Sequence, residues 1–209
     1  MVLRQGPAAV FFRYPAFRFR PGHADCLHTD LRIGNRMLFR DGGTYRYTDR
    51  LHHLSEAQRH NTVTFDDSDQ MPKLGQFLYG SWPKAEKSWL NLSDPSQCEA
   101  RAGYKDHKGN QHLRELVLTP HDFLCVDHMS GAARKATLRW RLDSADWRLE
   151  DNTITDEKSR VEIECNQPLS QIRLVPSSES LYYRQLTPCL LLEVDVCQLP
   201  ATFKTRVIF

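Results

Sequence analysis

Three side chains of metal-binding type follow one another in the first third of the chain: His23, then Asp41 18 positions later, then His60 after another 19. Each flanks a segment with strand character, and these segments are residues 27–33, 37–39 and 62–65. Because strand ends that are distant in sequence can meet at one rim of an antiparallel sheet, we expect the three side chains to converge. Two imidazoles and a carboxylate suit a zinc ion whose fourth position is filled by water or another group.

Because the chain contains nine histidines, two histidines and an aspartate could also have this spacing by chance, without binding a metal. In that interpretation the two imidazoles are ordinary exposed residues at a sheet rim. Cupin-like metal enzymes form a third possibility, since they are also all-β proteins with histidine ligands. They need a His-x-His pair followed closely by Glu, and the sequence contains no such pair.

The composition indicates one globular domain over residues 1–209. Hydrophobic residues make up 40% of the chain, which is enough for a sizeable core. The net charge of +2 comes from well-mixed charges and gives no reason to expect nucleic acid as a partner.

No apolar run approaches the roughly 18 residues of a membrane span. The apolar residues 8–12 are interrupted by Arg13 too early for a signal peptide, so the sequence itself predicts no export.

The pattern along the chain predicts an all-β fold. Apolar and polar residues alternate in four segments, namely residues 137–142, 162–165, 171–175 and 191–197. Turn residues recur at short intervals between such segments, and only residues 49–59 show a helical turn, within a loop. Many short strands with closely spaced turns favour a large antiparallel β-sandwich of jelly-roll type.

The chain contains six cysteines and no C-x-x-C pair. We expect the six to be buried thiols, with disulfides as the alternative.

Three ordered motifs resemble those of heparinase II/III-like proteins. They are Gly22-His23-Ala24-Asp25, Asp41-Gly42-Gly43-Thr44-Tyr45 and His60-Asn61-Thr62-Val63. The family has His-Ala-Asp, Asp-Pro-Gly-Thr-Tyr and His-Asn-Thr in the same order, so Gly42 replaces a proline. The segments 82–85 (Trp-Pro-Lys-Ala) and 123–131 continue the likeness in order.

The resemblance implies a sandwich domain that works with a second domain. Such proteins usually combine an N-terminal α/α toroid with a C-terminal β-sandwich, and this sequence is similar to the sandwich alone. We therefore expect the toroid to be absent from this chain and to act in cis or in trans. The family resemblance also assigns a structural zinc ion to His23, Asp41 and His60. Relatives are mostly bacterial and periplasmic or secreted.

The family's lyases cleave uronate-containing acidic polysaccharides by β-elimination, mostly with groups of the toroid. Their sandwich commonly adds a histidine two residues before the zinc-binding histidine, where this chain has Pro21. Arg20 and His28 are the replacement candidates for catalysis, against the alternatives of a solvated arginine and a histidine on a sheet face. Tyr45 and Tyr47 are candidates for stacking on sugar rings, against simple packing on one side of a strand.

Two functions follow from the resemblance. The first is the β-sandwich domain of a polysaccharide lyase-like protein that is incomplete as an enzyme by itself. The alternative is a non-catalytic carbohydrate-binding or structural metal-binding domain. Pro21 favours the alternative, because a proline can neither donate nor accept a proton, whereas the order of the motifs fits both.

Overall fold

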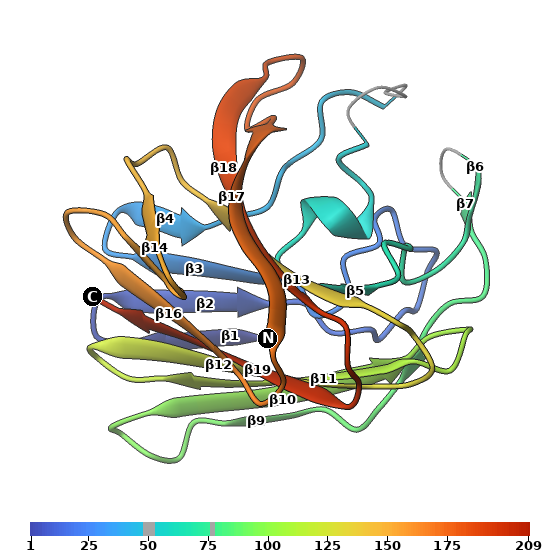
Figure 1. Cartoon of the computed structure of the whole chain (residues 1–209), viewed down its shortest axis with the longest axis horizontal. Coiled ribbons are helices and arrows are strands. Elements are labelled where there is room, and N and C mark those ends of the chain that lie inside the picture. Colours follow the sequence, from blue (N-terminus) through green and yellow to red (C-terminus); the bar gives the residue numbers. More distant parts are fainter. Residues whose placement is uncertain (48–52, 76–77) are drawn as a thin grey trace.

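A computed structural model describes residues 1–47, 53–75 and 78–209 and shows two large antiparallel sheets packed on one another (Figure 1). The predicted all-β sandwich is confirmed. The described residues contain one short helical element, the 3₁₀ turn η1 (Ala57–Arg59), and no helix among them is long and apolar enough to cross a bilayer. Residues 49–52 of the predicted helical turn lie outside the described part of the chain.

The first sheet has the order β1-β2-β3-β4-β13-β18-β17, with β5 paired to β13. Its strands are β1 (Val2–Gln5), β2 (Ala8–Phe12), β3 (Thr29–Ile33), β4 (Arg36–Phe39), β5 (Val63–Phe65), β13 (Ala136–Leu142), β17 (Leu169–Glu179) and β18 (Thr187–Val196). The strands expected from the pattern before and after the three candidate ligands are therefore present as β3, β4 and β5.

The second sheet has the order β14-β15-β16-β19-β12-β11-β10-β8, with β9 paired to β10. Its strands are β8 (Lys84–Ala85), β9 (Trp89–Asn91), β10 (Cys98–Lys105), β11 (Gln111–Leu118), β12 (Asp122–Ser130), β14 (Arg148–Glu150), β15 (Thr153–Thr155), β16 (Arg160–Cys165) and β19 (Ala201–Ile208). A separate two-stranded ribbon consists of β6 (Lys73–Gly75) and β7 (Leu78–Tyr79).

Strands β11 and β12 each alternate buried and partly exposed residues, as expected for a sheet with one face on the core. Strand β13 is different, because all seven of its residues are buried. Its polar residues are covered by neighbouring strands: Arg139 donates hydrogen bonds to Glu193 (2.7 Å) and Thr64 (2.6 Å). The polar positions of 137–142 therefore mark a second buried face rather than a solvated one.

Trp140 of β13 connects the two sheets. It is fully buried, its ring stacks on Phe39 with centroids 4.4 Å apart, and its Nε1 donates to Thr205 Oγ1 of β19 at 3.0 Å. The guanidinium of Arg114 from β11 lies 4.9 Å from the ring centroid of Trp140.

The six cysteines are free thiols, and four of them are buried (Cys26, Cys98, Cys125 and Cys189).

Replacing Trp140 by Ala should lower the free energy of unfolding by about 3–5 kcal/mol, because it opens a cavity between the sheets and removes a buried hydrogen bond. Trp89→Ala is the matched control, since Trp89 is partly exposed on β9, and we expect a change within about 1 kcal/mol. Urea unfolding followed by far-UV circular dichroism measures both values. Equal losses in the two variants would contradict this description of the core.

Candidate metal centre

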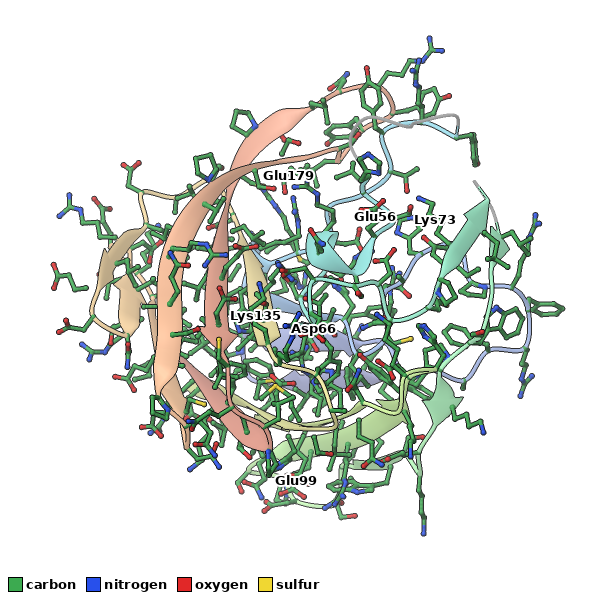
Figure 2. The ribbon with its side chains drawn as sticks, turned by 45° about the vertical axis from the view of Figure 1, so that its right-hand side comes forward. Glu56, Asp66, Lys73, Glu99, Lys135 and Glu179 are labelled. Carbon is green, nitrogen blue, oxygen red and sulfur yellow. The ribbon has the colours of Figure 1, made fainter. Side chains whose placement is uncertain are left out.

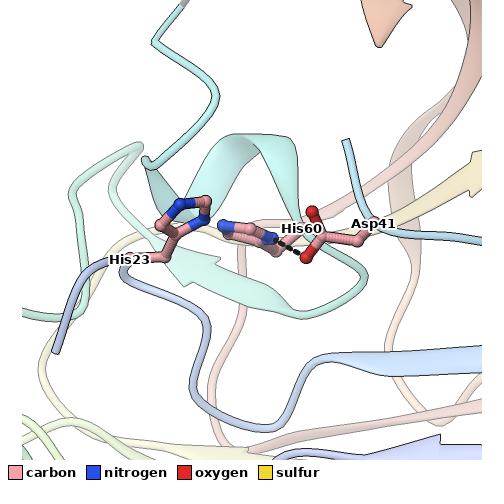
Figure 3. A group of neighbouring side chains, drawn as sticks. All are labelled: His23, Asp41 and His60. Carbon is pink, nitrogen blue, oxygen red and sulfur yellow. Dashed lines mark ion pairs between the residues drawn. The ribbon is translucent and has the colours of Figure 1, made fainter. Parts of the chain in front are cut away.

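The connections that follow β2, β4 and η1 bring His23, Asp41 and His60 together at one end of the first sheet (Figure 3). His23 lies in the long connection from β2 to β3, and Asp41 comes two residues after β4. His60 ends η1 in an extended conformation and leads into β5. Three separate connections therefore each contribute one side chain to the cluster.

The three side chains each offer one ligand atom, and these atoms lie within 4.8 Å of one another. His60 Nδ1 is 3.3 Å from Asp41 Oδ2, and the rings of His23 and His60 have centroids 5.3 Å apart. Tetrahedral zinc with bonds of about 2.1 Å separates its ligand atoms by about 3.4 Å. Small side-chain rotations would therefore bring all three atoms to coordinating distance.

The cluster holds buried polar atoms without hydrogen-bond partners. They are His23 Nδ1, Asp41 Oδ2 and both ring nitrogens of His60, which is half of all such side-chain atoms in the described part of the chain. The second atoms of two ligands are engaged: Asp41 Oδ1 accepts from the N–H of Gly43 at 2.6 Å, and His23 Nε2 lies 3.3 Å from Thr44 Oγ1. Because buried polar atoms are normally satisfied, this pattern fits a metal ion bound by His23, Asp41 and His60.

The electrostatics of the cluster favour the ligand protonation states. Burial would raise the pKa of Asp41, but the close approach of His60, together with His28 and the N–H of Gly43, holds it well below its usual range. Burial and the neighbouring His60 lower the pKa of His23. Neutral imidazole and ionised carboxylate are the forms that bind zinc, and the pKa shifts of His23 and Asp41 both favour these forms.

His28, a candidate for catalysis, lies behind the cluster and not on the surface. It is fully buried, its Nδ1 accepts from the backbone N–H of Asn61 at 3.0 Å, and its Nε2 therefore carries the proton and donates to Asp30 at 2.8 Å. Nε2 is also 3.8 Å from Asp41 Oδ2. In this arrangement His28 orients the residues around the candidate metal ligands, and its catalytic role stays a prediction.

Arg20, the other catalytic candidate, is exposed in the β2–β3 connection, three residues before His23. Pro21 beside it is buried, so the position at which lyases commonly carry a histidine has no titratable group and no free access to solvent. The catalytic role of Arg20 also stays a prediction.

The candidate sugar-stacking residues Tyr45 and Tyr47 line a cavity of about 620 Å³ that reaches His23. Tyr45 is half-buried, whereas Tyr47 is 73% exposed. The volume falls within the roughly 300–1,000 Å³ of small-molecule sites. Charged residues line the same cavity, namely Arg46, Glu56 and Lys73. Figure 2 shows Glu56 and Lys73 close to one another at this end of the molecule.

Arg114 of β11 is a residue of the site that sequence reasoning missed. It is fully buried, and its Nε and Nη2 bind the carboxylate of Asp127 on β12 at 2.6 and 3.0 Å. Its Nη1 donates to the backbone oxygens of Leu27 (2.7 Å) and Asn61 (2.6 Å). The second sheet thereby holds the segments that follow His23 and His60 at a fixed separation.

His112 completes this buried ion pair, because its Nε2 lies 2.6 Å from Asp127 Oδ1. Burial would raise the pKa of Asp127, but Arg114 and His112 outweigh that effect and hold it well below its usual range. The carboxylate is therefore ionised in the folded chain throughout the neutral range. We call Arg114, Asp127 and His112 the buried clamp.

Comparison with known proteins matches the chain to one sequence family and to solved structures that share its fold. The sequence model described as "Heparinase II/III-like, C-terminal" matches residues 1–189, whereas no curated protein matches the chain. A heparinase III gene product with methylated lysines superposes with a TM-score of 0.75 at 18% identity, over 97% of this chain and 32% of that one. The heparan sulfate lyase HepC from Pedobacter heparinus gives 0.77 at 14% identity, over 96% and 33%. This chain therefore spans about a third of the length of these two solved chains.

Replacing Asp127 by Asn should lower the free energy of unfolding by about 3–5 kcal/mol, because it leaves the buried guanidinium of Arg114 without a counter-charge. Glu162→Gln is the matched control: Glu162 pairs with Arg160 at the surface, and such pairs contribute less than about 1 kcal/mol. Urea unfolding at pH 7 measures both values.

The pH dependence of the Asp127→Asn effect provides a second check. A carboxylate with a lowered pKa stabilises the fold above the pKa of the unfolded chain, about 3.9, and loses this effect as the pH falls further. The difference between wild type and Asp127→Asn should therefore shrink below about pH 4. A difference that stays constant down to pH 2 would contradict the role of the ionised carboxylate.

Proposed function

Because the chain belongs to the heparinase II/III-like family, we propose that it is the β-sandwich domain of a polysaccharide lyase-like protein that binds uronate-containing acidic polysaccharide beside a structural zinc ion. The observation that carries this proposal is the convergence of His23, Asp41 and His60, whose buried ligand atoms lack hydrogen-bond partners. His23 also lines a cavity that bears cations and tyrosines. Cations neutralise uronate carboxylates, and tyrosine rings stack on sugars.

The zinc ion in this proposal is structural and is held by His23, Asp41 and His60. Bound there, it would tie the β2–β3 connection, the segment after β4 and the end of η1 to one another. Because ligands on three separate connections are joined, loss of the ion should loosen this end of the sandwich and the cavity wall that contains His23.

The proposed chemistry is β-elimination, shared with an α/α toroid domain supplied in cis or in trans. A base must remove the proton next to the uronate carboxylate, and a cation must first neutralise that carboxylate. Arg20 and the cavity residue Arg46 are the candidates here for the second task. The relatives' greater length supports a further domain, because this chain corresponds to about a third of them.

A non-catalytic carbohydrate-binding domain is the second candidate. Two observations favour it: Pro21 is buried where lyases commonly have a histidine, and His28 has both ring nitrogens engaged by Asn61 and Asp30. In that case the metal and the cavity persist without acid–base chemistry from the sandwich.

The purified chain should bind one zinc ion, and His60→Ala should abolish that binding, because His60 presents two unsatisfied ring nitrogens to the cluster. His121→Ala, which removes an exposed histidine far from the ligands in sequence, should leave the stoichiometry at one. Zinc at a hundred times its dissociation constant should stabilise the wild type by about 2.7 kcal/mol. Elemental analysis and thermal unfolding with and without a chelator test both points, and zinc retained by His60→Ala would refute the assignment.

A lyase assay separates the two candidate functions. We expect the chain alone to give no ultraviolet absorbance from unsaturated uronate product, and the same chain with the toroid domain of a heparinase III relative to give that absorbance. A mixture that binds the polysaccharide without forming product would favour the non-catalytic candidate. Product from the chain alone would contradict the assignment of most catalytic groups to the toroid.

A further inference from the structure

We propose that the turn between β17 and β18, residues 180–186, is a second wall of the glycan site that lengthens it beyond the cavity. We call these residues the hairpin tip. The ligand class is an anionic oligosaccharide that contains uronate and is long enough to contact both the cavity and the tip. This inference rests on the proposed function and adds a binding surface to it.

The hairpin tip is fixed to the segment that carries Asp41. Ser180 donates its backbone N–H to the oxygen of Gly42 at 2.8 Å, and Arg184 donates to the oxygen of Tyr45 at 2.8 Å. Gly43 makes this contact possible, because its φ is +74° and a Cβ there would lie 2.0 Å from the oxygen of Ser180. Figure 1 shows the β17–β18 hairpin projecting beyond the sheet at this end. The tip therefore continues the wall that bears Tyr45.

The side chains of the tip suit a sugar with a negative charge. Tyr182 and Tyr183 are 71% and 59% exposed, so their rings are accessible to a pyranose face. The guanidinium of Arg184 lies 5.7 Å from the ring centroid of Tyr183, which places a cation beside a stacking surface. A carboxylate on a sugar stacked at Tyr183 would lie within reach of Arg184.

The charges of the cavity and the tip together favour an anion. Arg46 and Lys73 line the cavity, and Arg184 adds a third cation at the tip. The acidic residue that lines the same cavity, Glu56, is occupied by a contact of 2.7 Å with His53 Nδ1. The wall therefore has an excess of positive charge even though the whole chain is nearly neutral. A neutral glycan would make no ionic contact with these cations.

The test uses the full zinc-loaded chain and two unsulfated uronate-containing oligosaccharides, of four and ten sugar units, in isothermal titration calorimetry. The double variant Tyr182→Ala/Tyr183→Ala should bind the decasaccharide about tenfold more weakly, because two stacking surfaces are lost, and should bind the tetrasaccharide as the wild type does. Trp89→Ala, which removes a partly exposed aromatic ring from the second sheet, should change neither affinity.

Arg184→Gln keeps the tyrosines and tests the charge separately. We expect weaker decasaccharide binding and a smaller loss of affinity between low and high salt than in the wild type, because one ionic contact is removed. Both variants change exposed turn residues, so an unaltered circular dichroism spectrum and melting temperature should accompany them.

The outcomes separate this inference from the proposed function. Decasaccharide affinity unchanged in the double variant, with normal binding by the wild type, would overturn the hairpin tip as a glycan wall. Failure of the wild type to bind either oligosaccharide would overturn the proposed function, and the hairpin-tip inference with it.

Discussion

The bidentate ion pair between Arg114 and Asp127 is the contact on which the site's geometry depends. A guanidinium with no exposed surface is tolerated only if charge and hydrogen-bonding capacity are both satisfied, and Asp127 alone cannot supply both. Arg114 therefore also donates to the carbonyl oxygens of Leu27 and Asn61 and to Thr29 Oγ1. The hydrogen bonds that stabilise the buried guanidinium thus set the separation of two segments that flank candidate metal ligands.

Asn61 passes this constraint on to the first sheet. Its side-chain NH₂ donates to the oxygen of Thr29 at 2.9 Å, and its Oδ1 accepts from the backbone N–H of Arg141 at 2.6 Å. Its backbone N–H also fixes the tautomer of His28, which contacts Asp41. The asparagine after His60 therefore joins the start of β3, the central strand β13 and the buried His28. An amide side chain beside the candidate ligand His60 can both donate and accept hydrogen bonds, so it fixes the position of His60 relative to two strands.

The sequence pattern predicts the sandwich from alternation along strands, and it predicts the convergence of His23, Asp41 and His60 from their places at strand ends. The zinc assignment comes from the family resemblance and stays a prediction. The sequence pattern does not predict the buried clamp. His112 and Arg114 alternate with apolar residues on β11, which is the pattern of a half-exposed strand, but here the polar residues face inward. Charged side chains are normally exposed, so only the three-dimensional pairing with Asp127 identifies them as core. The contact of the hairpin tip with Gly42 and Tyr45 is equally non-local and has no signal in the sequence.

The central claim is that His23, Asp41 and His60 bind one zinc ion. X-ray absorption spectroscopy at the zinc edge of the loaded protein tests it most directly, because imidazole, carboxylate and thiolate ligands give distinct first shells. The account predicts nitrogen and oxygen ligands at about 2.0–2.2 Å, with the outer-shell scattering of two imidazoles. A sulfur shell near about 2.3 Å, which would indicate binding to the chain's free cysteines, would contradict it.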